Sequence, residues 1–140
     1  MKITTAFFAA VLFFLGTMAT DSQSYAQDVC DGTPSSHKLI IHVSDNRPTN
    51  VTQAGQPADD VYVCIGDQVE WQLVGSAKQF YVDFIDGAPF EGSGKKNSNN
   101  NGKISVVVGG SAQPGMAYKY DIGIADGGVL DPRIIIGGEH

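Results

Sequence analysis

The chain has 140 residues, 17 glycines, two cysteines and a formal net charge of −6 at pH 7. Its length predicts a single domain. An acidic chain without a basic stripe is a poor match for nucleic acid, because phosphate binding depends on clustered Lys and Arg, so we expect no nucleic-acid partner.

The first 26 residues are typical of a secretory signal peptide. Lys2 precedes an apolar run from Ala6 to Leu15, and Ser24-Tyr25-Ala26 supplies a cleavage point. Cleavage after Ala19 is the alternative, and a buried N-terminal helix is the other interpretation of the run. The run is too short to span a bilayer, which needs about 20 apolar residues. We therefore expect an exported chain, periplasmic or extracellular, with no membrane span and one domain over residues 27–140.

Both cysteines, Cys30 and Cys64, lie in the mature part of the chain. An even count in an exported chain predicts a disulfide between them. On the chain-entropy model, closing this loop stabilises the fold by about 3–4 kcal/mol. A redox or metal role is the alternative, but the two residues are far apart in sequence and neither has a second thiol beside it.

The mature chain lacks a helical period and instead has short stretches of period two, separated by Gly, Pro, Asn and Asp. Within one of them, Val69, Trp71 and Leu73 face one way. The stretch before it forms a pair with it around the turn Gly66-Asp67. About seven strands and frequent turns predict an all-β, antiparallel sandwich or barrel. In chain order the predicted strands are 39–43, 60–65, 68–74, 79–85, 104–108, 117–124 and 133–136.

Two segments between these strands are predicted to be irregular. Residues 45–59 contain Pro48, Gly55 and Pro57 and are expected to form a crossover. Residues 92–102 have almost nothing apolar and are expected to be the most mobile part of the mature chain. The nearby basic cluster of Lys95, Lys96 and Lys103 is interpreted as solvated charge, with a binding role as the alternative.

A resemblance to the cupredoxin family rests on three motifs. Residues 61–71 (VYVCIGDQVEW) resemble a cupredoxin strand that meets Gly-Asp and continues as Val-x-Trp. Tyr118-Lys-Tyr120 resembles the start of the penultimate strand, and residues 130–136 (LDPRIII) are similar to the closing strand of members without copper. The resemblance covers about residues 39–137 and implies a Greek-key β-sandwich. Trp71 is then expected in the core, with Phe80, Phe84 and Tyr118 near it.

The same resemblance implies where copper ligands would stand. A blue-copper site needs two imidazoles, a thiolate and a weak axial ligand such as Met. The four positions hold Phe80 (or Gln79 if the register slips by one), Ile122, Ala125 and Leu130. Because these side chains lack the required donors, we expect no type 1 copper site and no resident cofactor.

The histidines are the other candidate metal ligands. His37 and His42 are five residues apart on a predicted strand and should face opposite sides of the sheet, and His140 is the last residue. We interpret them as surface histidines. The alternative is a periplasmic metal-handling (copper-binding) protein that uses histidines outside the lost site, because imidazole favours Cu(II) and Ni(II).

No arrangement typical of an enzyme is present in the sequence. Asp83, Asp86 and Glu91 are interpreted as turn and exposed-strand carboxylates rather than as an acid/base pair. The sequence contains no nucleophile elbow, phosphate loop or zinc pattern. We therefore expect a non-enzymatic protein.

The preferred interpretation is a binding module for an unidentified protein or small ligand. The expected contact surface is the loop end where cupredoxins hold metal, with Phe90, Val129 and Leu130 as contact residues, because exposed apolar patches are often interaction sites. Besides metal handling, a structural subunit of a surface layer is an alternative, and a catalytic domain ranks last.

Overall fold

A computed structural model describes residues 30–75, 79–125 and 127–138. The predicted signal peptide, residues 1–26, lies outside the described residues, as does His140. The described part contains strands and no helix. The strands are β1 (Ser36–Ser44), β2 (Arg47–Gln53), β3 (Gln56–Pro57), β4 (Asp60–Val63), β5 (Gln68–Val74), β6 (Phe80–Asp83), β7 (Lys95–Asn97), β8 (Lys103–Val107), β9 (Ala117–Lys119), β10 (Asp121–Ile124), β11 (Val129–Leu130) and β12 (Arg133–Ile136).

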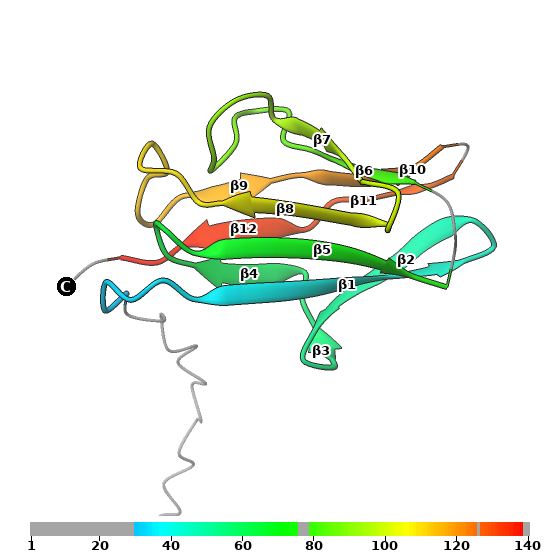
Figure 1. Ribbon diagram of the computed structural model, residues 1–140, viewed down its shortest axis with the longest axis horizontal. Helices are drawn as coiled ribbons and strands as arrows, with labels where there is room; N and C mark the ends of the chain where they lie inside the picture. The colour runs from blue at the N-terminus through cyan, green and yellow to red at the C-terminus, as the bar shows by residue number, and fades with distance from the viewer. Residues whose placement is uncertain (1–29, 76–78, 126, 139–140) are drawn as a thin grey trace, which may run out of the picture.

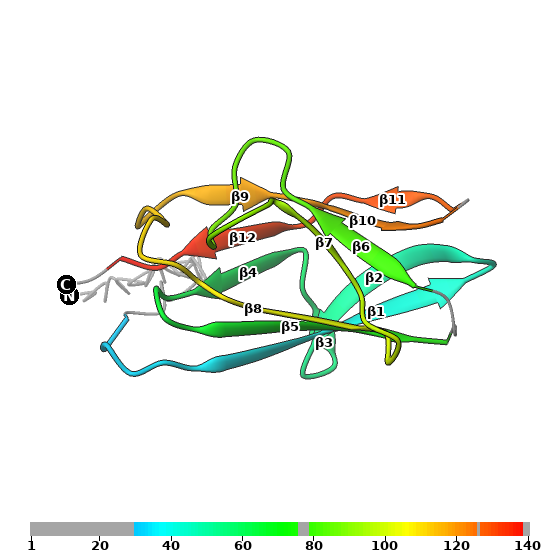
Figure 2. The ribbon, with the colours of Figure 1, turned by 45° about the horizontal axis from the view of Figure 1, so that its top comes forward.

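The strands form two facing layers (Figures 1 and 2). One layer is a five-stranded sheet in the order β3-β2-β1-β5-β8. The other consists of two sheets, β11-β10-β6-β7 and β4-β12-β9. These two are nearly continuous, because only Tyr120 separates β9 from β10 and only Asp131 and Pro132 separate β11 from β12. The predicted all-β sandwich is confirmed.

The strand pairing is mixed rather than wholly antiparallel. β1 pairs with β5 in parallel, and so does β12 with β4, while the other pairings are antiparallel. The predicted pairing of β4 with β5 around Gly66-Asp67 is wrong, because the turn carries the chain from one layer to the other. Both layers bury alternate residues, so the period of two cannot tell which strands are hydrogen-bonded.

The predicted crossover at residues 45–59 contains two strands instead. Asp45 and Asn46 have φ of 51° and 59°, the left-handed conformation that a two-residue type I′ hairpin turn requires, and they join β1 to β2. Pro48 lies in β2 where the register shifts, so its missing N–H is tolerated. The segment predicted to be the most mobile, residues 92–102, contains β7, which pairs with β6.

The core has the faces that the period of two predicts. Val69, Trp71 and Leu73 are buried on β5, as expected. The aromatic cluster around Trp71 includes Tyr120 rather than Tyr118. The Tyr120 ring meets the indole edge-on at 5.6 Å, and Phe84 stacks on Tyr120 at 4.7 Å. Burial raises the pKa of Tyr120 far above its ordinary value, despite the hydrogen bond from Trp71.

Tyr118 is only half buried, and its hydroxyl accepts a hydrogen bond from the backbone N–H of Gln113. Within the described residues, no helix is long and apolar enough to cross a membrane.

Candidate binding groove

Three of the four positions that the resemblance assigns to copper ligands come together on adjacent strands. Phe80 on β6 is paired with Ile124 on β10, and Ile122 on β10 is paired with Leu130 on β11. Phe80 and Ile122 are buried and Leu130 packs against the core, whereas Ala125 is exposed just after β10. Apolar packing therefore occupies this corner of the sandwich. Among the described residues, no group of three or more His, Cys, Asp and Glu side chains is placed to hold a metal ion.

His37 and His42 lie on opposite faces of β1 by strand parity, and hydrogen bonds hold both rings. Nε2 of His37 lies 2.8 Å from the carboxylate of Asp67, and its Nδ1 lies 3.2 Å from the side-chain amide nitrogen of Gln53. The ionised carboxylate can only accept a hydrogen bond, so Nε2 carries the proton and donates it. Nδ1 then accepts a hydrogen bond from the side-chain amide of Gln53. Nε2 of His42 lies 2.9 Å from the hydroxyl of Thr52. Both nitrogens of His37 are thus engaged, which leaves no free lone pair for a metal.

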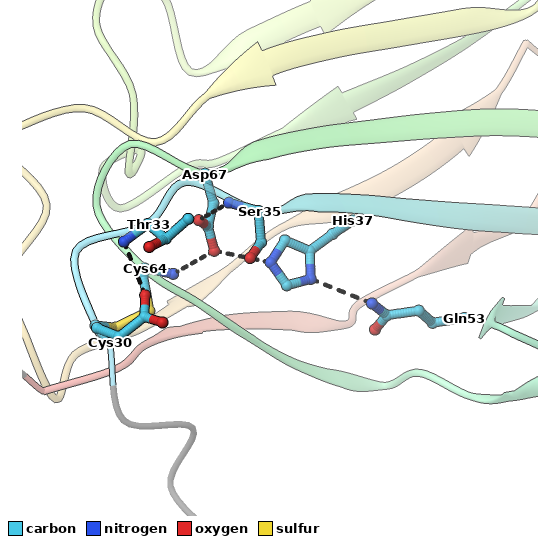
Figure 3. A network of polar contacts seen from close by, with 8 residues as sticks. Cys30, Thr33, Ser35, His37, Gln53, Cys64 and Asp67 are labelled. Atoms are coloured by element: carbon cyan, nitrogen blue, oxygen red, sulfur yellow. Dashed lines mark hydrogen bonds and ion pairs between the residues drawn. A yellow bond between two sulfur atoms is a disulfide. The ribbon is translucent and has the colours of Figure 1, made fainter.

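Among the described residues, Asp67 accepts hydrogen bonds from three different residues and is only 2% exposed. Figure 3 shows it beside Ser35, Cys64 and His37. Its carboxylate oxygens lie 2.7 Å from the backbone nitrogen of Ser35, 2.8 Å from that of Cys64 and 2.8 Å from Nε2 of His37. Burial raises the pKa of Asp67, but these hydrogen bonds outweigh burial and leave the pKa below its ordinary value. Asp67 therefore remains ionised and ties the segment before β1 to the turn between β4 and β5.

The predicted disulfide between Cys30 and Cys64 is confirmed, with a Cα–Cα distance of 5.7 Å. It lies beside the Asp67 network in Figure 3. The covalent bond and the carboxylate act on the same two segments, residues 30–37 and 64–67. This end of the sandwich is consequently a structural clamp, and among the described residues no buried side-chain nitrogen or oxygen lacks a hydrogen-bond partner.

The predicted contact surface of Phe90, Val129 and Leu130 is not one surface. Phe90 is 5% exposed, because its ring packs edge-on against Phe84 at 5.2 Å, so it cannot serve as an exposed contact residue. Val129 is 52% exposed but belongs to β11, at the opposite edge of the sheet from β7. The sequence missed this separation because the strand order of the sheet is not visible in the strand period.

Phe90 instead forms part of a groove where the two layers meet at their edges. The groove has a volume of about 440 Å³. We call it the β7–β8 groove, because β7 and β8 are the last strands of their sheets. In Figure 2, β7 lies above β8, and β5 separates β8 from β1. Its lining residues are Phe90, Glu91, Lys96, Ser105, Val106, Val107 and Gly109.

The groove combines an apolar floor with two opposite charges. The ammonium of Lys96 lies 5.3 Å from the centre of the Phe90 ring, within range of a cation–π interaction. Val106 packs partly against the core, whereas Val107 is 59% exposed. Neither Lys96 nor Glu91 forms an ion pair with another described residue. Neither charge is therefore neutralised by an ion pair within the described part of the chain.

The three carboxylates considered in the sequence have separate positions. Asp83 lies on β6 opposite Asp121 and Lys95, Asp86 is exposed after this strand, and Glu91 lines the groove. The basic residues are more ordered than expected. Lys95 lies 4.4 Å from the centre of the Tyr81 ring, and Lys103 lies 3.4 Å from Glu70. The prediction that these three lysines lie in a loop is wrong, because Lys95 and Lys96 lie on β7 and Lys103 lies on β8, but Lys95 is exposed to solvent as expected.

No protein-family model matches the chain. A comparison with the sequences of curated proteins also found no match. Solved structures do match, including a pseudoazurin from Sinorhizobium meliltoi at 18% identity and a TM-score of 0.46, covering 75% of this chain and 76% of that one. Two reduced amicyanin mutants match at 14% and 13% identity with TM-scores of 0.41 and 0.42, each covering 78% of this chain and 86% of theirs.

Proposed function

We propose that this protein is an exported, non-enzymatic binding module that holds its ligand in the β7–β8 groove. The observation that carries the proposal is the groove itself, where an apolar floor of Phe90 and Val106 lies beside the unpaired charges of Lys96 and Glu91. Ligand sites typically combine apolar walls with a few convergent polar groups. A groove of this size would accept a few side chains of a peptide or a small amphipathic molecule.

Two features support export and a role outside electron transfer. Residues 1–26 have the pattern of a signal peptide, and the disulfide between Cys30 and Cys64 suits an oxidising compartment. The positions that would supply blue-copper ligands hold Phe80, Ile122, Ala125 and Leu130, whose side chains carry no donor atom. These side chains therefore offer no ligands for a blue-copper ion, and we place the contact site at the groove instead.

Selection of a random peptide library displayed on phage against the mature protein tests this function. Selected peptides are then measured by calorimetry against the wild type, Lys96→Ala and Lys38→Ala. Lys38 is an exposed lysine on β1, so its replacement makes the same change of charge away from the groove. We expect Lys96→Ala to weaken binding about fivefold or more, and Lys38→Ala to leave it unchanged. Equal affinity for both variants, or no selected peptide, would contradict the proposal.

A further inference from the structure

We propose that the free edge of β8 binds an extended segment of a partner protein as an added β-strand. This inference rests on the proposed function, since the edge forms one wall of the β7–β8 groove. It goes further by naming the kind of ligand and the atoms that recognise it. Strand addition of this kind uses main-chain hydrogen bonds for affinity and side-chain pockets for specificity.

The register of β5 and β8 identifies the backbone groups that face outward. The N–H of Leu73 donates to the carbonyl of Gly102, and the N–H of Val108 donates to the carbonyl of Asp67. In an antiparallel ladder the hydrogen-bonded pairs recur at every second residue, so Ile104 and Val106 also bond to β5. The residues between them direct their N–H and C=O groups away from β5.

Three residues of β8 direct their backbone N–H and C=O groups away from β5, and for one of the three these groups already have hydrogen-bond partners. Lys103 donates its N–H to the Asn99 side chain at 3.1 Å and accepts from the Asn99 N–H at 2.9 Å. Ser105 and Val107 remain, because β8 pairs with no described strand except β5. They present two donors and two acceptors at alternate positions. Only an extended backbone has complementary groups at this spacing.

Two other edge strands, β3 and β7, carry features that oppose such pairing. β3 is two residues long and contains Pro57, which has no N–H to donate. β7 is three residues long and two of them are lysines, which oppose strand pairing on an edge, whereas the one lysine of β8, Lys103, lies at the start of its strand. β8 has no proline over five residues, and Val107 is 59% exposed. The edge of β8 is thus longer than the edges of β3 and β7, and it lacks the proline of β3.

The groove determines which side chains the added strand would carry. On β8, Ile104 and Val106 face the interior and Ser105 and Val107 face outward. A strand that continues this sheet would place every second side chain inward, beside Val106 and over Phe90, where an aliphatic residue is favoured. The formal charge of −6 opposes a second copy of this chain as the occupant, because two copies would repel. The occupant is therefore an extended segment of another protein with alternating apolar residues.

The test uses a capped seven-residue peptide of alternating Thr and Val, bound to the mature disulfide-containing protein. Two derivatives carry N-methyl groups, one on the valine amides and one on the threonine amides, so each blocks one edge of the strand. We expect one derivative to lose about tenfold or more in affinity and the other less than about threefold. The parent peptide should also protect the amides of Ser105 and Val107 from hydrogen exchange.

A matched pair of variants provides the second readout. Val107→Pro removes the outward N–H and should still fold, because that N–H does not bond to β5, whereas Val107→Ala keeps it. Binding should be lost in Val107→Pro and retained in Val107→Ala. No binding of the parent peptide up to about 1 mM, or equal affinity for both N-methylated derivatives, overturns strand addition.

The outcomes separate this inference from the proposed function. If a peptide shifts the resonances of Phe90 and Lys96 while both N-methylated derivatives bind equally, the groove binds a ligand but strand addition is wrong. If no peptide or selected ligand perturbs these residues, both are wrong. Protection of the Val107 amide in the peptide-free protein, together with a dimer in sedimentation, would assign the edge to a second copy and overturn the proposed partner.

Discussion

The indole Nε1 of Trp71 donates a hydrogen bond to the hydroxyl of Tyr120 at 3.1 Å, and both side chains are buried. The bond joins β5 in one layer to the break between β9 and β10 in the other. Tyr120→Phe keeps the ring but leaves a buried N–H without an acceptor. We expect a loss of about 1–3 kcal/mol in the free energy of unfolding, measured by urea denaturation.

Tyr118→Phe is the matched control for this prediction. Its hydroxyl also accepts one hydrogen bond, from the Gln113 N–H, but at an exposed position where water can replace it. The control should change stability by about 0.5 kcal/mol or less. An equal loss of unfolding free energy in the two variants would show that the buried Trp71–Tyr120 hydrogen bond stabilises the fold no more than an exposed one does.

The Asp67 carboxylate predicts a specific loss of stability in acid. Its pKa in the folded protein lies below its ordinary value. Its contribution is therefore complete above the unfolded pKa of about 3.9 and disappears as the pH falls through the folded pKa. Asp67→Asn should lose about 2–3 kcal/mol near neutral pH, because an amide oxygen replaces a charge-assisted acceptor.

Thermal unfolding followed between pH 7 and pH 2 measures this effect. The difference between wild type and Asp67→Asn should narrow as the pH falls. Asp86→Asn serves as the control, since Asp86 is exposed in the loop after β6 and forms no ion pair with a described residue. A constant difference across the whole pH range would mean that the charge of Asp67 contributes nothing.

Gly123 on β10 is predicted to be intolerant of even a methyl group. A Cβ at this position would lie 2.2 Å from Cζ of Tyr81, the residue paired with it on β6. Gly123→Ala should force the Tyr81 ring away, also disturbing its contact with Lys95, at a cost of about 1–3 kcal/mol. A double-mutant cycle with Tyr81→Ala in urea denaturation measures the coupling.

In the Tyr81→Ala background, Gly123→Ala should be nearly neutral. Gly138→Ala provides a further control, because a Cβ there would have no neighbour within 4 Å. If Gly123→Ala destabilises both backgrounds equally, the close approach of the Tyr81 ring is not the cause.

The sequence was sufficient for two features that depend on simple patterns. The period of two correctly predicted the buried face of β5, and the even cysteine count correctly predicted the disulfide of Cys30 and Cys64. β2 was missed although Asp45-Asn46 is a recognisable hairpin turn, since Pro48 argued against a strand and its tolerance depends on a bulge. Turn chemistry was thus a better guide here than composition.

The candidate site could not be predicted because it depends on non-local geometry. Phe90 looked exposed in a polar segment, yet Phe84 and Lys96 enclose its ring. Tyr118 and Tyr120 are tyrosines two positions apart, and the sequence does not tell which of them packs in the core; Tyr118 pairs with Ile134 of β12. Asp67 was interpreted as a turn residue, because its partners Ser35 and His37 are 30 or more positions away in the sequence. Only the fold brings them within hydrogen-bonding distance. The β7–β8 groove likewise joins strands from different sheets.

The histidines are predicted to have a structural role rather than a role in metal handling. Asp67 and Gln53 engage both ring nitrogens of His37. Calorimetry with Cu(II), Cu(I) and Zn(II) on the mature protein should therefore give no tight one-to-one binding that depends on His37, and His37→Ala should lower stability instead. Tight binding that His37→Ala or His42→Ala abolishes would restore the metal-handling alternative.

Contact of a ligand with the β7–β8 groove can be observed residue by residue in solution. We suggest a ¹⁵N–¹H chemical-shift map of the mature protein titrated with a peptide selected from the phage library. The largest shifts should fall on residues 89–96 and 105–109, which line or flank the groove. Shifts concentrated at Ala125, Val129 and Leu130, with the groove unperturbed, would contradict this prediction.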